Sequence, residues 1–204
     1  MLRRRSYPRG DTMIEVLFAV SIFSLVAVGG LTIMDQGANA AQRSLEITLA
    51  REQIDAQSEA LRYLNASYVS SYQPGVVFNE STPAGQWQKM INYIINHSNV
   101  NFDTLDSSNK CRSPEQGWFF IDYQNAKFID YTIGEGSMGL ANTYAKVNYG
   151  MSPLTAEGTW IQAIRSSDVN KTGYVDFHIF ACWESPGTSV PETIATIVRL
   201  YEPR

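Results

Sequence analysis

The chain is organised around one uncharged stretch, VLFAVSIFSLVAVGGLTIM, which occupies Val16–Met34. As a helix at about 1.5 Å per residue, these 19 residues would span about 28 Å, close to the roughly 30 Å hydrocarbon core of a bilayer. Asp35 ends the stretch. The sequence therefore predicts a membrane-spanning helix over about residues 14–34.

The residues before this stretch carry a strong positive charge. Four of the chain's 16 basic residues lie in the first ten positions, with no acidic residue among them: Arg3, Arg4, Arg5 and Arg9. Basic flanks of a membrane helix stay on the cytoplasmic side. We therefore expect a single-pass topology in which the chain from Asp35 onward lies outside the cell membrane.

Several kinds of N-terminal segment share these features. The simplest is an uncleaved signal anchor. A secretory signal cleaved at Ala38-Asn39-Ala40 is a second, although the apolar run exceeds the usual length of about 7 to 15 residues. A third is a short leader that is removed on the cytoplasmic side, after Gly10. Arg4-Arg5 without the rest of the motif is weak support for a twin-arginine signal.

Glu15 favours the short leader. A carboxylate at the edge of an apolar segment is expensive, on the order of 2.5–3.5 kcal/mol if it reaches the bilayer centre. A simple anchor gains nothing from it. Cleavage after Gly10 would expose a new amine at Asp11, and Glu15 of one subunit could pair with the amine of the next. Glu15 would then set the registry of an assembly, a well-attested use of buried ions.

The sequence here resembles the type IV pilin family, including the pseudopilins of type II secretion. The resemblance lies in the basic leader, Gly10 as its last residue, Glu15 as the fifth residue after it, and the apolar run Val16–Met34. It covers about a fifth of the chain. Asp11 departs from the family, which usually has an apolar residue at this position, and its carboxylate could itself neutralise the adjacent amine.

The resemblance implies a maturation and an assembly route. A membrane-embedded prepilin peptidase would cleave after Gly10 and N-methylate Asp11. The implied partners are other pilin subunits in a helical filament, the assembly platform of a pilus or secretion system, and membrane lipid. It also implies a bacterial cell-membrane protein with an external head, which becomes part of an extracellular filament.

Gly29 and Gly30 interrupt the apolar run, and each costs roughly 0.5–1 kcal/mol in a helix interior relative to Ala. Two uses remain open. The pair could allow local unwinding when the subunit leaves the bilayer, or it could allow close packing against a neighbouring helix.

Residues 38–68 continue the helix beyond the membrane, because they contain neither Pro nor Gly. Apolar residues recur at Ile47, Ile54 and Leu61, which is typical of an amphipathic helix. Acidic and amide residues occupy the other positions. We expect one helix over residues 11–68, with its second half packed on a globular head.

The head, residues 69–204, is predicted to be α+β. A short helix is expected over Trp87–His97. The runs 118–123 and 127–131 predict a hairpin, and the runs 160–165, 174–180 and 193–201 predict an antiparallel meander. The predicted fold class is therefore α+β, a long N-terminal helix packed on a small antiparallel sheet.

Cys111 and Cys182 are the only cysteines, 71 residues apart. Both lie in the part of the chain expected outside the membrane, where oxidation is favoured. We expect a disulfide; two unpaired buried thiols are the alternative.

Other motifs in the head predict no chemistry. Gly134–Gly139 matches G-x-G-x-x-G but lacks the repeated βαβ context of a dinucleotide site. Asp168–Gly173 begins like a calcium loop, but Ile179 stands where the bidentate Glu belongs. His97 and His178 are the only histidines, too few for a zinc site even with Cys182. We expect no catalytic residues, metal or cofactor.

The composition sets the class of protein. Apolar residues make up 44% of the 204 residues and charged residues 18%, which excludes a disordered chain. The net charge of −4 becomes −8 once residues 1–10 are removed, so nucleic-acid binding is not expected. We expect a non-enzymatic subunit, a minor pilin or pseudopilin. The alternative is an exported binding or adhesion domain on an uncleaved anchor, and an anchored enzyme is a weaker rival.

Overall fold

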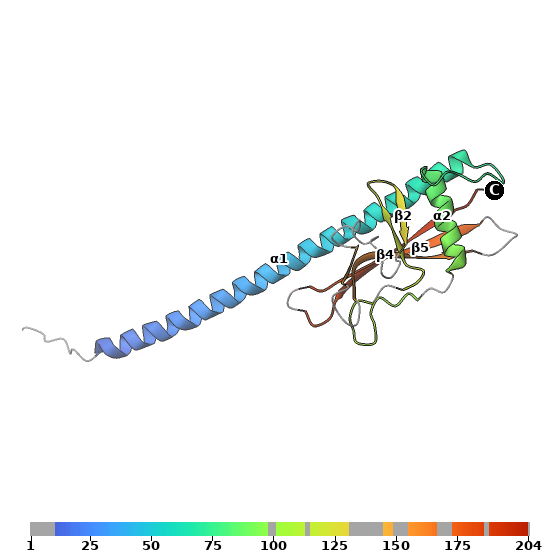
Figure 1. The fold of residues 1–204 in the computed structure, drawn as a ribbon. Helices are drawn as coiled ribbons and strands as arrows, with labels where there is room; N and C mark the ends of the chain where they lie inside the picture. The colour runs from blue at the N-terminus through green and yellow to red at the C-terminus, as the bar shows by residue number, and fades with distance from the viewer. Residues whose placement is uncertain are drawn as a thin grey trace, which may run out of the picture. The chain divides into compact units, whose positions relative to one another are not determined.

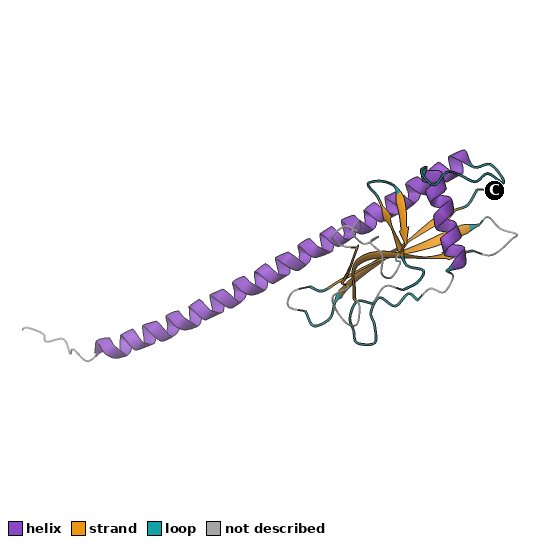
Figure 2. Ribbon diagram, viewed as in Figure 1, coloured by secondary structure: helices purple, strands orange, loops and turns teal. Residues whose placement is uncertain are grey.

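A computed structural model describes residues 11–97, 101–112, 115–130, 145–148, 155–166, 173–185 and 188–203 of the chain. Its elements, shown in Figures 1 and 2, are α1 (Asp11–Ser71), α2 (Pro83–Asn96), β1 (Phe119–Asp122), β2 (Lys127–Asp130), β3 (Ala145–Asn148), β4 (Thr155–Arg165), β5 (Tyr174–Trp183) and β6 (Glu192–Tyr201). The chain divides into two compact units, residues up to Ser44 and Leu45–Arg204. The second half of α1 therefore belongs to the same unit as the sheet.

The predicted fold class is confirmed. α1 is one continuous helix that ends three residues beyond the expected boundary, at Ser71. Of the expected apolar positions, Ile54 and Leu61 are at most 3% exposed and Ile47 is partly buried against the core. Ala50 and Leu64 of the same half are also buried. α2 begins earlier than predicted because Thr82 caps it, accepting a hydrogen bond from Gly85 N. Pro83 follows at the first position, where a missing N–H costs nothing.

The strands form a six-stranded antiparallel sheet in the order β2-β1-β4-β5-β6, and β3 also pairs with β4. The predicted hairpin is β1–β2, with Phe120 opposite Ile129. The predicted meander is β4–β5–β6. β3 and the first five residues of β4 were not predicted from the sequence. The motifs at Gly134–Gly139 and Asp168–Lys171 lie outside the described residues.

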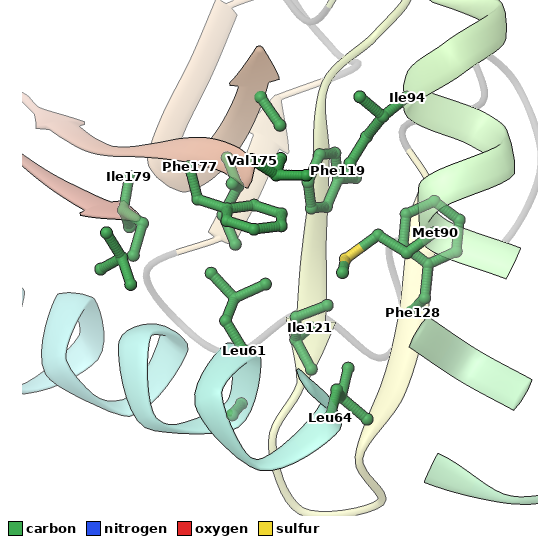
Figure 3. Packing of buried hydrophobic residues seen from close by; sticks show 14 of the residues in the cluster. Leu61, Leu64, Met90, Ile94, Phe119, Ile121, Phe128, Val175, Phe177 and Ile179 are labelled. Carbon is green, nitrogen blue, oxygen red and sulfur yellow. The ribbon is translucent and has the colours of Figure 1, made fainter. Parts of the chain in front are cut away.

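One face of the sheet packs on the two helices and forms the main core (Figure 3). α1 contributes Leu61 and Leu64, and α2 contributes Met90 and Ile94. Alternate residues of the strands face them, as the two-residue period of a strand requires. These strand residues include Phe119, Ile121, Phe128, Val175, Phe177 and Ile179.

The opposite face of the sheet carries a second apolar cluster. Trp160 stacks between Trp118 and Phe180, with ring centroids 4.6 and 5.6 Å away. Cys111 and Cys182 belong to the same cluster and form the predicted disulfide. The bridge fastens the segment before β1 to the end of β5. Strands β1, β4 and β5 thus carry buried apolar side chains on both faces of the sheet.

Two buried glutamines cap backbone groups that strand pairing leaves free. Gln57 of α1 donates to the carbonyl of Ile121 and accepts from its N–H, both at 2.8 Å. β1 meets β4 only at the Phe119–Ile161 pair, so this side of Ile121 has no strand beside it. Gln86 of α2 accepts from the N–H of Phe128 at 2.9 Å. Side chains of both helices therefore replace missing neighbouring strands.

Candidate functional site on the N-terminal helix

The first half of α1 is the candidate site, because it holds the residues that the sequence singles out. All residues from Met13 to Ser44 are exposed. Its large apolar side chains include Leu25, 75% exposed, and Phe23, 72% exposed. The helix is long and apolar enough to cross a membrane. A surface of this kind needs an apolar environment, either lipid or other helices.

The hydroxyl groups within this half satisfy their own hydrogen-bonding needs. Ser21 donates to the carbonyl of Leu17 and Ser24 to that of Val20, both at 2.8 Å. Thr32 donates to the carbonyl of Val28 at 2.9 Å. Because each bond closes within one helical turn, these side chains can enter hydrocarbon without an unpaired donor.

Glu15 differs from these hydroxyls. It is the only charged residue from Met13 to Met34, and it is exposed. Within the described part of the chain, no side chain or backbone group forms a hydrogen bond or ion pair with its carboxylate. The charge of Glu15 is therefore not compensated within the described residues.

The two residues assigned to processing are placed only in part. Gly10 lies outside the described residues, and of Asp11 only the backbone is described, as the first residue of α1. The structure therefore does not bring Glu15 and the region of Gly10 together as a site. The proposed cleavage after Gly10 stays a prediction from the sequence.

Gly29 and Gly30 lie inside the helix without interrupting it. A Cβ added at either position would meet nothing within 4 Å. No contact within the described chain therefore requires glycine here. Both interpretations of the pair, local unwinding and close packing on a neighbouring helix, remain open.

Glu46 lies where α1 joins the head and forms hydrogen bonds that were not predicted from the sequence. Its position predicted a solvent-facing carboxylate on the polar side of the helix, which is wrong. Its Oε2 accepts hydrogen bonds from Trp183 Nε1 at 3.1 Å and from Ser185 Oγ at 2.6 Å. The end of β5 is thereby fastened to the start of the amphipathic half of α1.

A cavity of the head, about 1050 Å³ in volume, is an open groove beside the second half of α1. Its walls are α1, the start of α2 and the β1–β2 turn, and its lining includes Glu59, Tyr63, Asp122 and Lys127. Glu59 is paired with Arg62 on the same helix. No group of three or more metal-ligating side chains occurs among the described residues.

The two histidines lie apart in the head. His97 is the C-terminal cap of α2 and stacks on Tyr93 with ring centroids 4.2 Å apart. His178 lies on β5, and the ring of Phe102 packs against its imidazole with ring centroids 4.3 Å apart. Cys182, on the same strand, is bridged to Cys111, so its sulfur is not a thiolate that could share a metal with His178.

Burial lowers the pKa of His178 below its ordinary value of 6.5, against the opposing effect of the nearby Asp176 carboxylate. His178 therefore binds a proton more readily in the unfolded chain than in the folded protein. The contribution of neutral His178 to folding stability is fully present above pH 6.5 and declines as the pH falls through that value. Between pH 7.5 and pH 5, urea unfolding should show a greater stability loss for wild type than for His178→Gln. The difference should stay below about 1 kcal/mol, because the imidazole remains partly exposed. Equal losses in both proteins would contradict this assignment.

Comparisons with known proteins add nothing to this geometry: no family model, no curated protein and no solved structure matches the chain. The arrangement itself is pilin-like, with a long apolar N-terminal helix, an antiparallel sheet packed on its second half, and a disulfide. The function must therefore be argued from the residues.

Proposed function

We propose that the chain is a structural subunit of a type IV pilus or type II secretion-like filament, a minor pilin or pseudopilin. In this proposal, a prepilin peptidase removes residues 1–10 and the first half of α1 anchors the subunit in the membrane. The same half later packs against its equivalents in the filament. The head lies outside and carries any specific interaction.

Glu15 is the observation that supports this proposal most strongly. Three hydroxyl groups of this apolar helix form hydrogen bonds within the helix, whereas the carboxylate of Glu15 forms none with the described residues. This difference suits a carboxylate that pairs with a positive charge on another molecule. The amine created at residue 11 of a neighbouring subunit has the required opposite charge. Pairing with it would compensate Glu15 in the assembled state and fix the axial position of each subunit.

The exposed apolar surface supports the same proposal. A single membrane anchor needs only an apolar exterior, whereas a filament subunit needs side chains that pack against copies of the same helix. Large side chains such as Phe18 and Phe23, together with the small Gly29 and Gly30, offer both protrusions and close-approach sites. The alternative, a membrane-tethered binding domain, gives no role to Glu15.

Replacement of Glu15 tests the proposal. In cells that assemble the filament, Glu15→Ala should enter the membrane normally but appear in sheared filaments at one tenth or less of the wild-type amount. Asp35→Ala is the matched control, because it removes an exposed carboxylate from the other end of the same apolar segment. It should assemble as wild type does. Incorporation of Glu15→Ala at the wild-type level would contradict the registry role.

A further inference from the structure

The outer edge of β6 presents a row of backbone groups that no other described strand adjoins. β6 is the last strand in the sheet order, ten residues long, and pairs with β5. Just beyond its end, Glu202 N donates to Gly173 O at 2.8 Å. Because hydrogen-bonded and non-bonded pairs alternate in an antiparallel ladder, the N–H and C=O groups of alternate residues point away from β5. These residues are Thr193, Ala195, Ile197, Arg199 and Tyr201.

Amide side chains cap some of the outward backbone groups elsewhere in the head. Gln57 caps Ile121, and Gln86 caps the N–H of Phe128. Asn65 Nδ2 donates to the carbonyl of Tyr201 at 3.2 Å, at the far end of β6 itself. From Thr193 to Arg199, none of the described residues bonds to the outward backbone groups. We call the outward row of residues 193–199 the open edge.

Apart from Arg199, the open edge carries no charged side chain, and other features that protect exposed strands are also missing from it. Proteins usually protect them with Lys, Pro or a bulge, and residues 192–201 contain neither Lys nor Pro. The register with β5 is uninterrupted over all ten pairs. Ile197, in the middle, is 61% exposed. Such a strand would be an aggregation hazard unless something normally pairs with it.

The local charge indicates what kind of partner fits. Residues 45–204 contain 17 acidic and 11 basic residues, a formal charge of −6. On the open edge, however, the one charge is Arg199, and two hydrogen bonds of 2.7 Å to Asp176 neutralise it. Its guanidinium also lies 4.1 Å from the centroid of the Tyr174 ring. The edge is therefore electrically neutral on an acidic head and favours an uncharged partner.

We propose that the open edge of β6 receives an extended, uncharged segment of another polypeptide by β-strand addition. The backbone of the segment would satisfy the outward N–H and C=O groups. Its alternate apolar side chains would cover Ile197 on one face of the sheet and extend the core past Ile194 and Leu200 on the other. These two residues are partly buried at the margin of the core.

A second copy using its own β6 fits less well. Symmetric antiparallel pairing of β6 with β6 would reverse the direction of the second half of α1, which packs along the sheet. On the proposed function, in which α1 is a continuous helix that anchors each subunit in one membrane in the same orientation, two chains could not both adopt that arrangement. The segment therefore comes from a partner that presents a free extended stretch.

Proline at an outward position tests the proposal without breaking the β5–β6 ladder. Ala195→Pro removes one outward N–H, a substitution that edge strands tolerate, and Ala195→Ser is the matched control that keeps it. The probe is a fluorescein-labelled, uncharged peptide of alternating Thr and Val residues, a sequence that does not occur in this chain. Its binding to the full-length chain in detergent micelles is followed by fluorescence anisotropy. Ile197→Lys serves as a second variant in case Ala195→Pro does not fold.

We expect saturable binding to wild type and to Ala195→Ser, with affinities within two-fold of each other. The peptide should bind Ala195→Pro and Ile197→Lys at least ten-fold more weakly than it binds wild type. A peptide that is N-methylated at alternate residues should also bind wild type at least ten-fold more weakly. Equal binding by these variants, or no saturable binding to wild type, would overturn the proposal. A homodimer captured by cross-linking through position 195 in membranes would overturn the choice of partner.

Discussion

Removal of the Cys111–Cys182 bridge should lower the free energy of unfolding of the head by about 4 kcal/mol. The bridge closes a loop of 71 residues, and in the chain-entropy model a loop of this length contributes about 4 kcal/mol. The double variant Cys111→Ala/Cys182→Ala should therefore unfold at a lower urea concentration, and at a temperature about 10 °C lower. Both cysteines are buried, at 3% and 0% exposed for Cys111 and Cys182, and alanine adds no polar group to the cluster.

Reduction of the wild-type protein provides the internal control for this experiment. Wild type in excess reductant should unfold at the same urea concentration as the double variant, whereas the reductant should leave the double variant unchanged. The tryptophan fluorescence of the second cluster should change in the same transition, because Trp118 and Trp160 stack beside the bridge. A loss below 1 kcal/mol on removal of the bridge would contradict the expected role.

Gln57→Leu should destabilise the head by about 3 kcal/mol, although it replaces a polar residue by an apolar one of similar size. Gln57 is 4% exposed, and its amide satisfies both backbone groups of Ile121. Leucine would leave a buried N–H and a buried C=O without partners, at about 1–3 kcal/mol each. Urea unfolding of the full-length chain measures the effect.

Gln53→Leu is the matched control for this change, because Gln53 lies one turn earlier on the same helix and is partly exposed. It should alter stability by less than 1 kcal/mol. Gln57→Glu should fall between wild type and Gln57→Leu at neutral pH, since a carboxylate accepts from the N–H of Ile121 but repels its carbonyl. If Gln57→Leu proved as stable as Gln53→Leu, the capping role of Gln57 would be wrong.

The main elements were predictable because each has a clear local signal. The apolar run and the recurrence of Ile47, Ile54 and Leu61 predict α1, and an absence of Pro and Gly predicts its length. β-branched and aromatic runs separated by turn residues predict the hairpin and the meander. Helix capping by Thr82 was missed because the preceding residues, rich in Ser, Pro and Asn, resemble a loop.

The contacts that hold the elements together were much less predictable. A glutamine on a helix is normally read as a solvent-facing residue, and nothing local distinguishes Gln57 from Gln53. Glu46 likewise has the position of a surface carboxylate, whereas Trp183 and Ser185 donate to it from 137 and 139 residues away. Such partners depend on which strand end lies beside the helix, and this is decided by the packing of the whole head.

The residues of the candidate site, in contrast, could be recognised from the sequence alone. Glu15, Gly29 and Gly30 are visible in the sequence because each is exceptional in an apolar run. The structure adds that the hydroxyl groups of the run are satisfied internally while Glu15 has no partner among the described residues. Under the proposed function, its partner belongs to another subunit.

The intact mass of the protein recovered from membranes of the native host tests the central claim most directly. The account predicts a chain that begins at Asp11, with or without one added methyl group, and that still contains the apolar half of α1. A chain that still begins at Met1 would contradict cleavage of the leader. A chain that begins at Ala41, with the apolar half removed, would contradict both the anchor and the filament.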